Sequence, residues 1–176
     1  SQEKSFASMI LFPKSGGTRL VQIRALQGGF PYYGSLETTP ASAGTSFKKR
    51  KTALVDQTLM LQYNVKVNDS IKIGKVTFLI AGTLNKAPGQ TNVASNIAPI
   101  VYIPMQYLDQ TGLLEKGSRI NYNFYYKYDH KVDISKLTKK LEPRLDKAGL
   151  NYDTIDTKKE NTGRAFGDLT RFLSLV

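Results

Sequence analysis

The feature that most constrains the fold is a change of hydrophobic period along the chain. Before residue 129, apolar residues occur in short runs or at every second position, which is typical of β-strands. After residue 132, steps of three and four residues predict helices. Strands followed mainly by helices predict an α+β fold in which helices pack on one face of a sheet. The clearest strand is RINYNFYYKY at 119–128, whose predicted core face carries Ile120, Tyr122, Phe124, Tyr126 and Tyr128.

Two apolar runs open the chain. Residues 6–12 predict a strand buried on both faces, and residues 19–26 predict a half-buried strand. The second strand has Val21, Ile23 and Ala25 on its inner face. Because PKSGGT between the runs has turn chemistry, the pair predicts an antiparallel hairpin.

The middle of the chain begins near Gly28, where glycine, proline and small polar residues predict a subdomain boundary. TTPASAGTSF is predicted to be a flexible loop, followed by the basic cluster KKRK at 48–51. TALVD predicts a strand, and its Asp56 is expected to cap a short helix. DSIKIGKVTFLIAG predicts two strands joined at Gly74, and PIVYI predicts a strand before a short helix that ends at Gly112.

The last part of the chain predicts two helices separated by a strand. Asp133 is expected to cap an amphipathic helix that ends at Gly149 and that Pro143 should kink or shorten. NYDTIDT at 151–157 predicts the strand, and an open-ended helix follows from about residue 160. The first helix is predicted to point Ile134, Leu137, Leu141, Leu145 and Ala148 inward. The apolar face of the second carries Phe166, Leu169, Phe172, Leu173 and Val176.

Both ends of the sequence look cut. SQEK leads directly into an apolar run, and the terminal helix has no stop signal after Val176. We therefore expect this chain to be a piece of a longer protein.

Charge and composition narrow the classes of function. The 176 residues contain 25 Lys and Arg against 14 Asp and Glu, a net charge of +11. This excess suggests an anionic partner such as nucleic acid, an anionic membrane surface or an acidic protein, unless the basic residues are only solvated. The chain contains no cysteine, which excludes disulfides, zinc–thiolate sites and thiol nucleophiles. No apolar run approaches the length of a membrane span.

The sequence contains no pattern of residues that indicates catalysis. The chain has a single histidine, His130, and without a second histidine or a cysteine it makes a poor metal ligand set, so we predict no metal site and no catalytic residue. The glycine pairs in KSGGT and QGGFPYYG do not continue as phosphate-binding motifs, and no cofactor is expected. The main alternative is a basic nucleic-acid or anion-binding module, because aromatic strands such as NYNFYYKY can stack on bases. That strand lacks the glycine-containing pattern of RNA-recognition strands.

Several segments, in this order and spacing, resemble one family. KTALVDQTLMLQYNVKVNDSIKIGKVTFLIAGTL is similar to the extracytoplasmic segment of MacB/FtsX-type ABC transporter permeases. Asn68 stands where that family usually has glycine, and asparagine tolerates the left-handed turn that a glycine would adopt. APIVYIPMQYLDQTG resembles the strand and short helix that follow, and GRAFGDLTRFLSLV resembles the run into the second transmembrane helix.

The resemblance implies an extracytoplasmic domain of a bacterial inner-membrane permease. It implies a porter-like lobe of sheet and helices from 1–28 and 119–176, and an inserted β-rich lobe at 29–118. It implies no catalytic residue and no cofactor in this domain, with ATP hydrolysed by a cytoplasmic subunit coupled through the membrane helices. The domain would relay conformational change and contact a periplasmic partner protein or a lipophilic substrate, and nucleic acid is not the expected partner.

Two sets of residues are candidates for these roles. Phe30, Tyr32 and Tyr33 lie in the loop GGFPYYGSLETTP between the expected lobes. Aromatic residues on such a loop either pack between lobes or contact a partner, and both alternatives stay open here. The apolar face of the terminal helix, listed above, is the candidate for coupling to the membrane.

Overall fold

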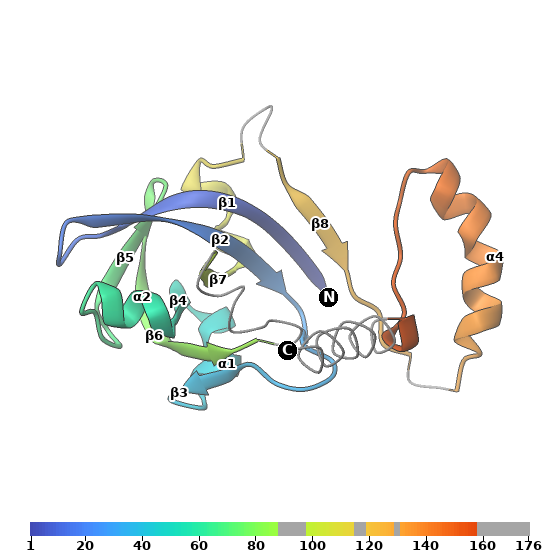
Figure 1. Ribbon diagram of the computed structural model, residues 1–176, viewed down its shortest axis with the longest axis horizontal. Coiled ribbons are helices and arrows are strands. Elements are labelled where there is room, and N and C mark those ends of the chain that lie inside the picture. The colour runs from blue at the N-terminus through green and yellow to red at the C-terminus, as the bar shows by residue number, and fades with distance from the viewer. Residues whose placement is uncertain (88–97, 115–118, 129–130, 158–176) are drawn as a thin grey trace, which may run out of the picture. The chain divides into compact units, whose positions relative to one another are not determined.

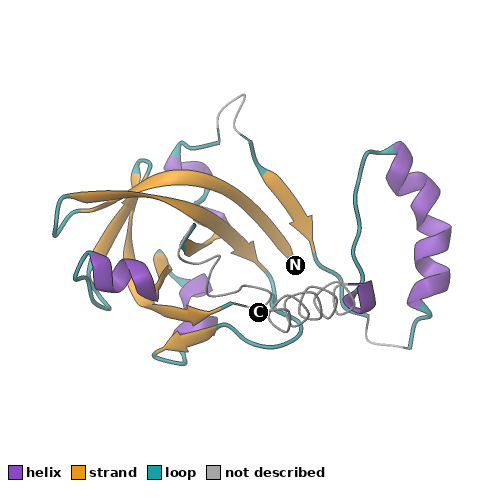
Figure 2. Ribbon diagram, viewed as in Figure 1, coloured by secondary structure: helices purple, strands orange, loops and turns teal. Residues whose placement is uncertain are grey.

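The computed structural model describes residues 1–87, 98–114, 119–128 and 131–157 (Figure 1). The chain forms two compact units, Ser1–Lys127 and Tyr128–Val176. The described strands are β1 Gln2–Phe12, β2 Gly17–Gln27, β3 Glu37–Thr39, β4 Thr52–Asp56, β5 Ser70–Ile73, β6 Val76–Lys86, β7 Ile100–Pro104 and β8 Asn121–Phe124. The described helices are α1 Ala43–Ser46, α2 Gln57–Gln62 and α4 Ile134–Lys147, with 3₁₀ turns at Phe47–Lys49, Met105–Tyr107 and Asp109–Thr111 (Figure 2).

Six of the described strands in the first unit close into a ring. Hydrogen bonds join them in the order β2–β7–β4–β6–β5–β1, and β1 pairs back to β2 over its whole length. Figure 1 shows these two long strands side by side. The pairs β2–β7 and β4–β6 are parallel, whereas the other ring pairs are antiparallel. Closure gives every ring strand a partner on both sides, which removes the free edges of an open sheet.

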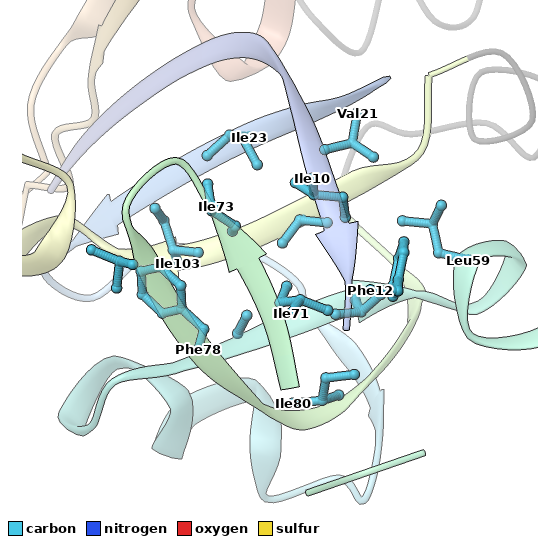
Figure 3. Packing of buried hydrophobic residues seen from close by; sticks show 14 of the residues in the cluster. Ile10, Phe12, Val21, Ile23, Leu59, Ile71, Ile73, Phe78, Ile80 and Ile103 are labelled. Atoms are coloured by element: carbon cyan, nitrogen blue, oxygen red, sulfur yellow. The ribbon is translucent and has the colours of Figure 1, made fainter. Parts of the chain in front are cut away.

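The ring encloses the larger hydrophobic cluster. Alternation along each strand sends one set of side chains into the ring, as the close-up of the cluster shows (Figure 3). The predicted inner face of β2 is confirmed, because Val21, Ile23 and Ala25 are all buried there. The other members of the cluster that are fully buried include Phe12, Ala53, Val55, Leu59, Ile71, Ile73, Phe78, Ile80, Val101, Ile103 and Leu108.

A second cluster covers the outer face of part of the ring. Leu54 of β4 and Tyr102 of β7 point out of the ring and pack with Phe47, which is completely buried. The expectation of a flexible loop at 38–47 is therefore wrong. Small residues there fold into α1, whose Ala43 is buried, and Thr38 donates a hydrogen bond to the carbonyl oxygen of Pro40 (2.8 Å).

Several local predictions for the middle of the chain are confirmed. Asp56 caps α2 by accepting hydrogen bonds from the backbone N–H (2.9 Å) and the hydroxyl (2.7 Å) of Thr58. Gly74 joins β5 to β6 at φ +55°, where an added Cβ would lie 2.1 Å from the carbonyl oxygen of Thr111. Asn68 adopts φ +73°, the left-handed conformation expected of an asparagine that replaces a glycine.

β1 corrects the prediction of a strand buried on both faces. Phe6, Ile10 and Phe12 point into the ring and are buried, whereas Met9 on the opposite face is 53% exposed. One face of a ring strand is interior and the other is exterior, so an unbroken apolar run does not require burial on both sides.

β8 also differs from its prediction. Tyr122, Phe124 and Tyr126 were expected on a core face, but they are 56%, 54% and 76% exposed. Among the described residues, β8 pairs with Gln2–Ser5 of β1, which precede the first residue of β1 that packs inside the ring. Its alternating face therefore runs past the end of the core. Only Ile120, just before the strand, packs against the ring cluster.

The second unit contains α4 as its main described element. Asp133 caps the helix as predicted, accepting from the backbone N–H of Lys136 (3.0 Å), and Gly149 follows at φ +66°. The helix is not shortened at Pro143, which lies inside it. The predicted inward burial of Ile134, Leu137, Leu141, Leu145 and Ala148 is wrong, since no residue of α4 is buried.

The strand predicted at 151–157 is also wrong. Residues 155–157 form a helical turn, begun by Thr154, whose hydroxyl oxygen accepts from the backbone N–H of Thr157 (3.1 Å). The terminal helix expected from residue 160 and the candidate His130 lie outside the described residues.

The α+β class is confirmed, while the grouping of 1–28 with 119–176 as a lobe separate from 29–118 stays a prediction. The structure adds that β1 pairs with β8, and that β1 and β2 share the ring interior with strands from 29–118.

Candidate partner-contact site

The loop after β2 carries the three aromatic candidates, and a lysine side chain binds its backbone. Lys48 donates hydrogen bonds to the carbonyl oxygens of Gly28 (2.9 Å) and Phe30 (2.6 Å). Burial lowers the pKa of this ammonium group. The residues of the basic cluster at 48–51 therefore differ in their surroundings. Lys48 is partly buried and binds the loop, whereas the other three side chains are exposed.

Phe30 connects the loop to the end of β8. Its side chain is half-buried against the second cluster, and its ring centroid lies 4.6 Å from that of Tyr125 at an interplanar angle of 38°. Aromatic pairs at this separation stabilise beyond the area that they bury. Phe30 is therefore a packing residue.

Tyr32 and Tyr33 are neighbours with different surroundings. The hydroxyl oxygen of Tyr32 accepts hydrogen bonds from Ser1, from Oγ at 2.9 Å and from the backbone nitrogen at 3.0 Å. Tyr33 is 59% exposed, and the ammonium group of Lys127 lies 5.7 Å from its ring centroid. A cation at that distance over a tyrosine ring is weakly attracted to it and keeps both groups available at the surface.

A second group of exposed aromatic side chains lies on β8 and just beyond it. Tyr122, Phe124 and Tyr126 have no counterpart in the candidate residues from sequence, because their alternation predicted a core. Lys4 of β1 lies 5.5 Å from the ring centroid of Tyr122. On the exposed surface of the first unit, a lysine therefore lies near an aromatic ring at two places, one on β8 and one on the loop.

The structure does not describe the other sequence candidates. Phe166, Leu169, Phe172, Leu173 and Val176 lie outside the described residues. Within the described ranges, histidine and acidic side chains form no group of three or more that could hold a metal ion. None of the helices in those ranges combines the length and the hydropathy that a membrane crossing requires.

Comparison with known proteins accounts for this fold. Residues 5–144 match the family model described as the MacB-like periplasmic core domain. The chain belongs to the MacB-like periplasmic core domain family. The expected MacB/FtsX-type extracytoplasmic domain of α+β class is thereby confirmed at the level of the family.

A curated relative supports the same assignment. The uncharacterized ABC transporter permease YbbP of Escherichia coli (strain K12) is 27% identical over 126 residues, which are 71% of this chain. The matched part is 15% of that protein's length, so this MacB-like domain corresponds to a small share of its relative.

Two solved structures share the fold. The periplasmic region of MacB from Actinobacillus actinomycetemcomitans has a TM-score of 0.53 at 13% identity, covering 93% of this chain and 75% of that one. A domain of a permease protein from Porphyromonas gingivalis has a TM-score of 0.52 at 12% identity, covering 84% and 69%. At these identities the likeness concerns the fold of the MacB-like domain alone.

Proposed function

We propose that this MacB-like domain is a non-catalytic extracytoplasmic part of an ABC transporter permease in a bacterial inner membrane. In this proposal the domain receives conformational change from a cytoplasmic ATP-binding subunit through membrane helices of the longer protein. It contacts a lipophilic substrate or a periplasmic partner protein on the outer side, and it needs no cofactor. The family match over residues 5–144 supports the class of protein.

The observation that carries the contact function is the contrast within one loop. Phe30 packs against Tyr125 in a tilted aromatic pair and Tyr32 accepts hydrogen bonds from Ser1, while Tyr33 presents most of its ring to solvent. Lys48 holds the loop backbone at two carbonyl groups. An exposed aromatic residue on a loop held in this way binds a partner at low cost in conformational entropy. The net charge of +11 favours an anionic or acidic contact surface.

The relay is proposed to pass through β8. This strand belongs to the first unit, and the chain enters the second unit at Tyr128, four residues after Phe124. A force applied to the second unit therefore reaches the ring along the backbone of residues 125–127.

The contact function is tested with Tyr33→Ser in the full-length permease. We expect efflux of the neutral lipophilic dye Nile red to fall about tenfold, a loss comparable to removing one hot-spot side chain. The melting temperature of the 176-residue chain should stay unchanged, because Tyr33 is mostly exposed. ATP hydrolysis by the permease complex should continue, since no catalytic group is altered.

Phe30→Ala is the matched control on the same loop. It should lower the melting temperature, because it removes the aromatic contact with Tyr125. Unchanged dye efflux in Tyr33→Ser would refute the contact role, and a lowered melting temperature in that variant would assign Tyr33 to packing. The alternative of a nucleic-acid-binding module has the net charge of +11 and the exposed aromatic residues of β8 in its favour, and the family match provides no support for it.

A further inference from the structure

A buried carboxylate lies where β8 joins the ring. Glu3 of β1 is only 2% exposed and occupies the face of β1 opposite to the ring interior. Removing a carboxylate from water is costly unless hydrogen bonds and an opposite charge replace the water. Glu3 therefore needs partners, and the identity of those partners shows what the residue does.

Two of the partners come from β8 and the residue that follows it. Asn123 donates from Nδ2 to Oε1 of Glu3, and Tyr125 donates from its hydroxyl to Oε2, both at 3.3 Å. Burial and the negative charge of Glu3 raise the pKa of Tyr125, so its hydroxyl keeps the proton that it donates. The backbone adds a short ladder, since Ser1 and Tyr125 exchange two hydrogen bonds of 2.9 Å. Asn123 of β8 and Tyr125 just after it thus both bind Glu3 through partly buried hydrogen bonds.

The third partner is a cation that is close but not bonded. Nε of Arg24, on β2, lies 4.0 Å from Oε1 of Glu3 and is buried without a hydrogen-bond partner among the described residues. Nη1 of the same side chain donates to the hydroxyl of Tyr102 on β7 over a long 3.4 Å. A buried guanidinium usually binds a carboxylate directly at 2.7–2.9 Å. Arg24 is therefore about 1 Å from a better bond to Glu3 than the one it has.

We infer that Glu3 is a two-position latch for β8. With β8 in place, Glu3 accepts hydrogen bonds from Asn123 and Tyr125 while Arg24 stays at 4.0 Å. When β8 moves away, both oxygens of Glu3 are released and Arg24 closes on them, so that the buried charge stays paired. The direct ion pair offsets part of the cost of releasing β8, and the ring below keeps its apolar contacts.

This arrangement gives the proposed relay a defined joint. A displacement that arrives along residues 125–127 would be converted into an exchange of partners at one carboxylate, rather than into deformation of the ring. The use of the latch in transport rests on the proposed function. The latch itself is tested on this chain alone, so the two can fail separately.

Hydrogen–deuterium exchange measures the hold of Glu3 on β8. In the 176-residue chain, Tyr125→Phe removes one donor to Glu3 and keeps the ring that packs against Phe30. We expect the backbone amides of Asn123 and Tyr125 to exchange about tenfold faster, as loss of one hydrogen bond to a charged acceptor predicts. Ring amides such as that of Val101 should not change. Tyr126→Phe is the matched control, because Tyr126 is 76% exposed, and it should leave all of these rates unchanged.

The second position is tested at Arg24 by NMR. The double variant Asn123→Ala with Tyr125→Phe removes both side-chain donors to Glu3. The Nε–H proton of Arg24 should then exchange more slowly with water, because it donates a hydrogen bond to Glu3. Equal amide exchange in Tyr125→Phe and Tyr126→Phe would overturn the hold of Glu3 on β8. If the ring amides accelerate as much as the amides of Asn123 and Tyr125, Glu3 stabilises the whole domain and is not a latch. An unchanged Arg24 Nε–H signal in the double variant would overturn the second position.

Discussion

The ring interior and the junction of β8 are held together by opposite kinds of contact. The buried members of the ring cluster are all hydrocarbon or thioether side chains, supplied mainly by strands that each have two neighbours. The junction has a four-residue ladder, one aromatic pair and a carboxylate that its neighbours satisfy at long distances. Apolar contacts of a closed ring change together, whereas polar contacts can be exchanged one by one. The comparison indicates that the ring supplies stability, and it is consistent with the proposal that the junction serves movement.

The largest effect that this comparison predicts is in the ring. Phe78 is fully buried there, so Phe78→Ala should lower the free energy of unfolding by about 3–5 kcal/mol in urea denaturation. The adjacent Leu79 is 51% exposed, and Leu79→Ala should stay within about 0.5 kcal/mol of the unchanged chain. If the two variants lose similar amounts, the ring interior is not the main source of stability.

A smaller effect is expected from a polar contact that supports the ring. Asp56 is 4% exposed and accepts both hydrogen bonds of Thr58 at the start of α2. Asp56→Ala should lower the free energy of unfolding by about 1–2 kcal/mol. Asp56→Asn keeps an acceptor oxygen and should recover most of that loss in the same urea measurement. A loss in Asp56→Asn as large as that in Asp56→Ala would mean that the negative charge, and not the cap, is needed.

Alkaline pH should affect the junction and leave the ring interior unaffected. Burial raises the pKa of both Tyr125 and Tyr102, so these hydroxyls favour the folded state while they are protonated. Their contribution is complete below the ordinary tyrosine pKa of about 10 and is lost as the pH rises through the raised values. Absorbance of the tyrosinate form should show delayed titration, and Tyr125→Phe should remove part of the delay. Titration of all tyrosines near their ordinary pKa would contradict a buried junction.

Local features of this fold could be predicted from sequence, and distant pairings could not. Asp56, Gly74 and Asn68 act through residues close to them in the chain, and each adopts the predicted role. Ring closure joins Gln22–Leu26 of β2 to Ile100–Pro104 of β7, and no period in either segment records that partner. The same limit explains β8, because alternation reveals that a strand has two faces and does not reveal where the core ends.

The candidate site shows the same difference between local features and distant contacts. Glycine and proline around Phe30, Tyr32 and Tyr33 indicated an aromatic loop, and composition alone could not tell packing from exposure. No sequence pattern indicated a role for Glu3, since its hydrogen bond with Tyr125 joins residues 122 positions apart. The strand prediction at 151–157 failed because the hydroxyl oxygen of Thr154 accepts a hydrogen bond from the backbone N–H of Thr157. This local contact favours a helical turn.

The closure of β1 onto β2 also determines the order in which this domain can fold. The hairpin is local and can form in microseconds, because its two strands are joined by a short turn. β2 must then wait for β7, which is paired to it in parallel across most of the first unit. Such distant pairings slow folding, because a long loop has to close before any contact offsets its entropy. A chain that reaches its compartment from the N-terminus therefore keeps the outer edge of β2 open until residue 104 has arrived. During that interval the unpaired edge of β2 is a place where the chain can aggregate.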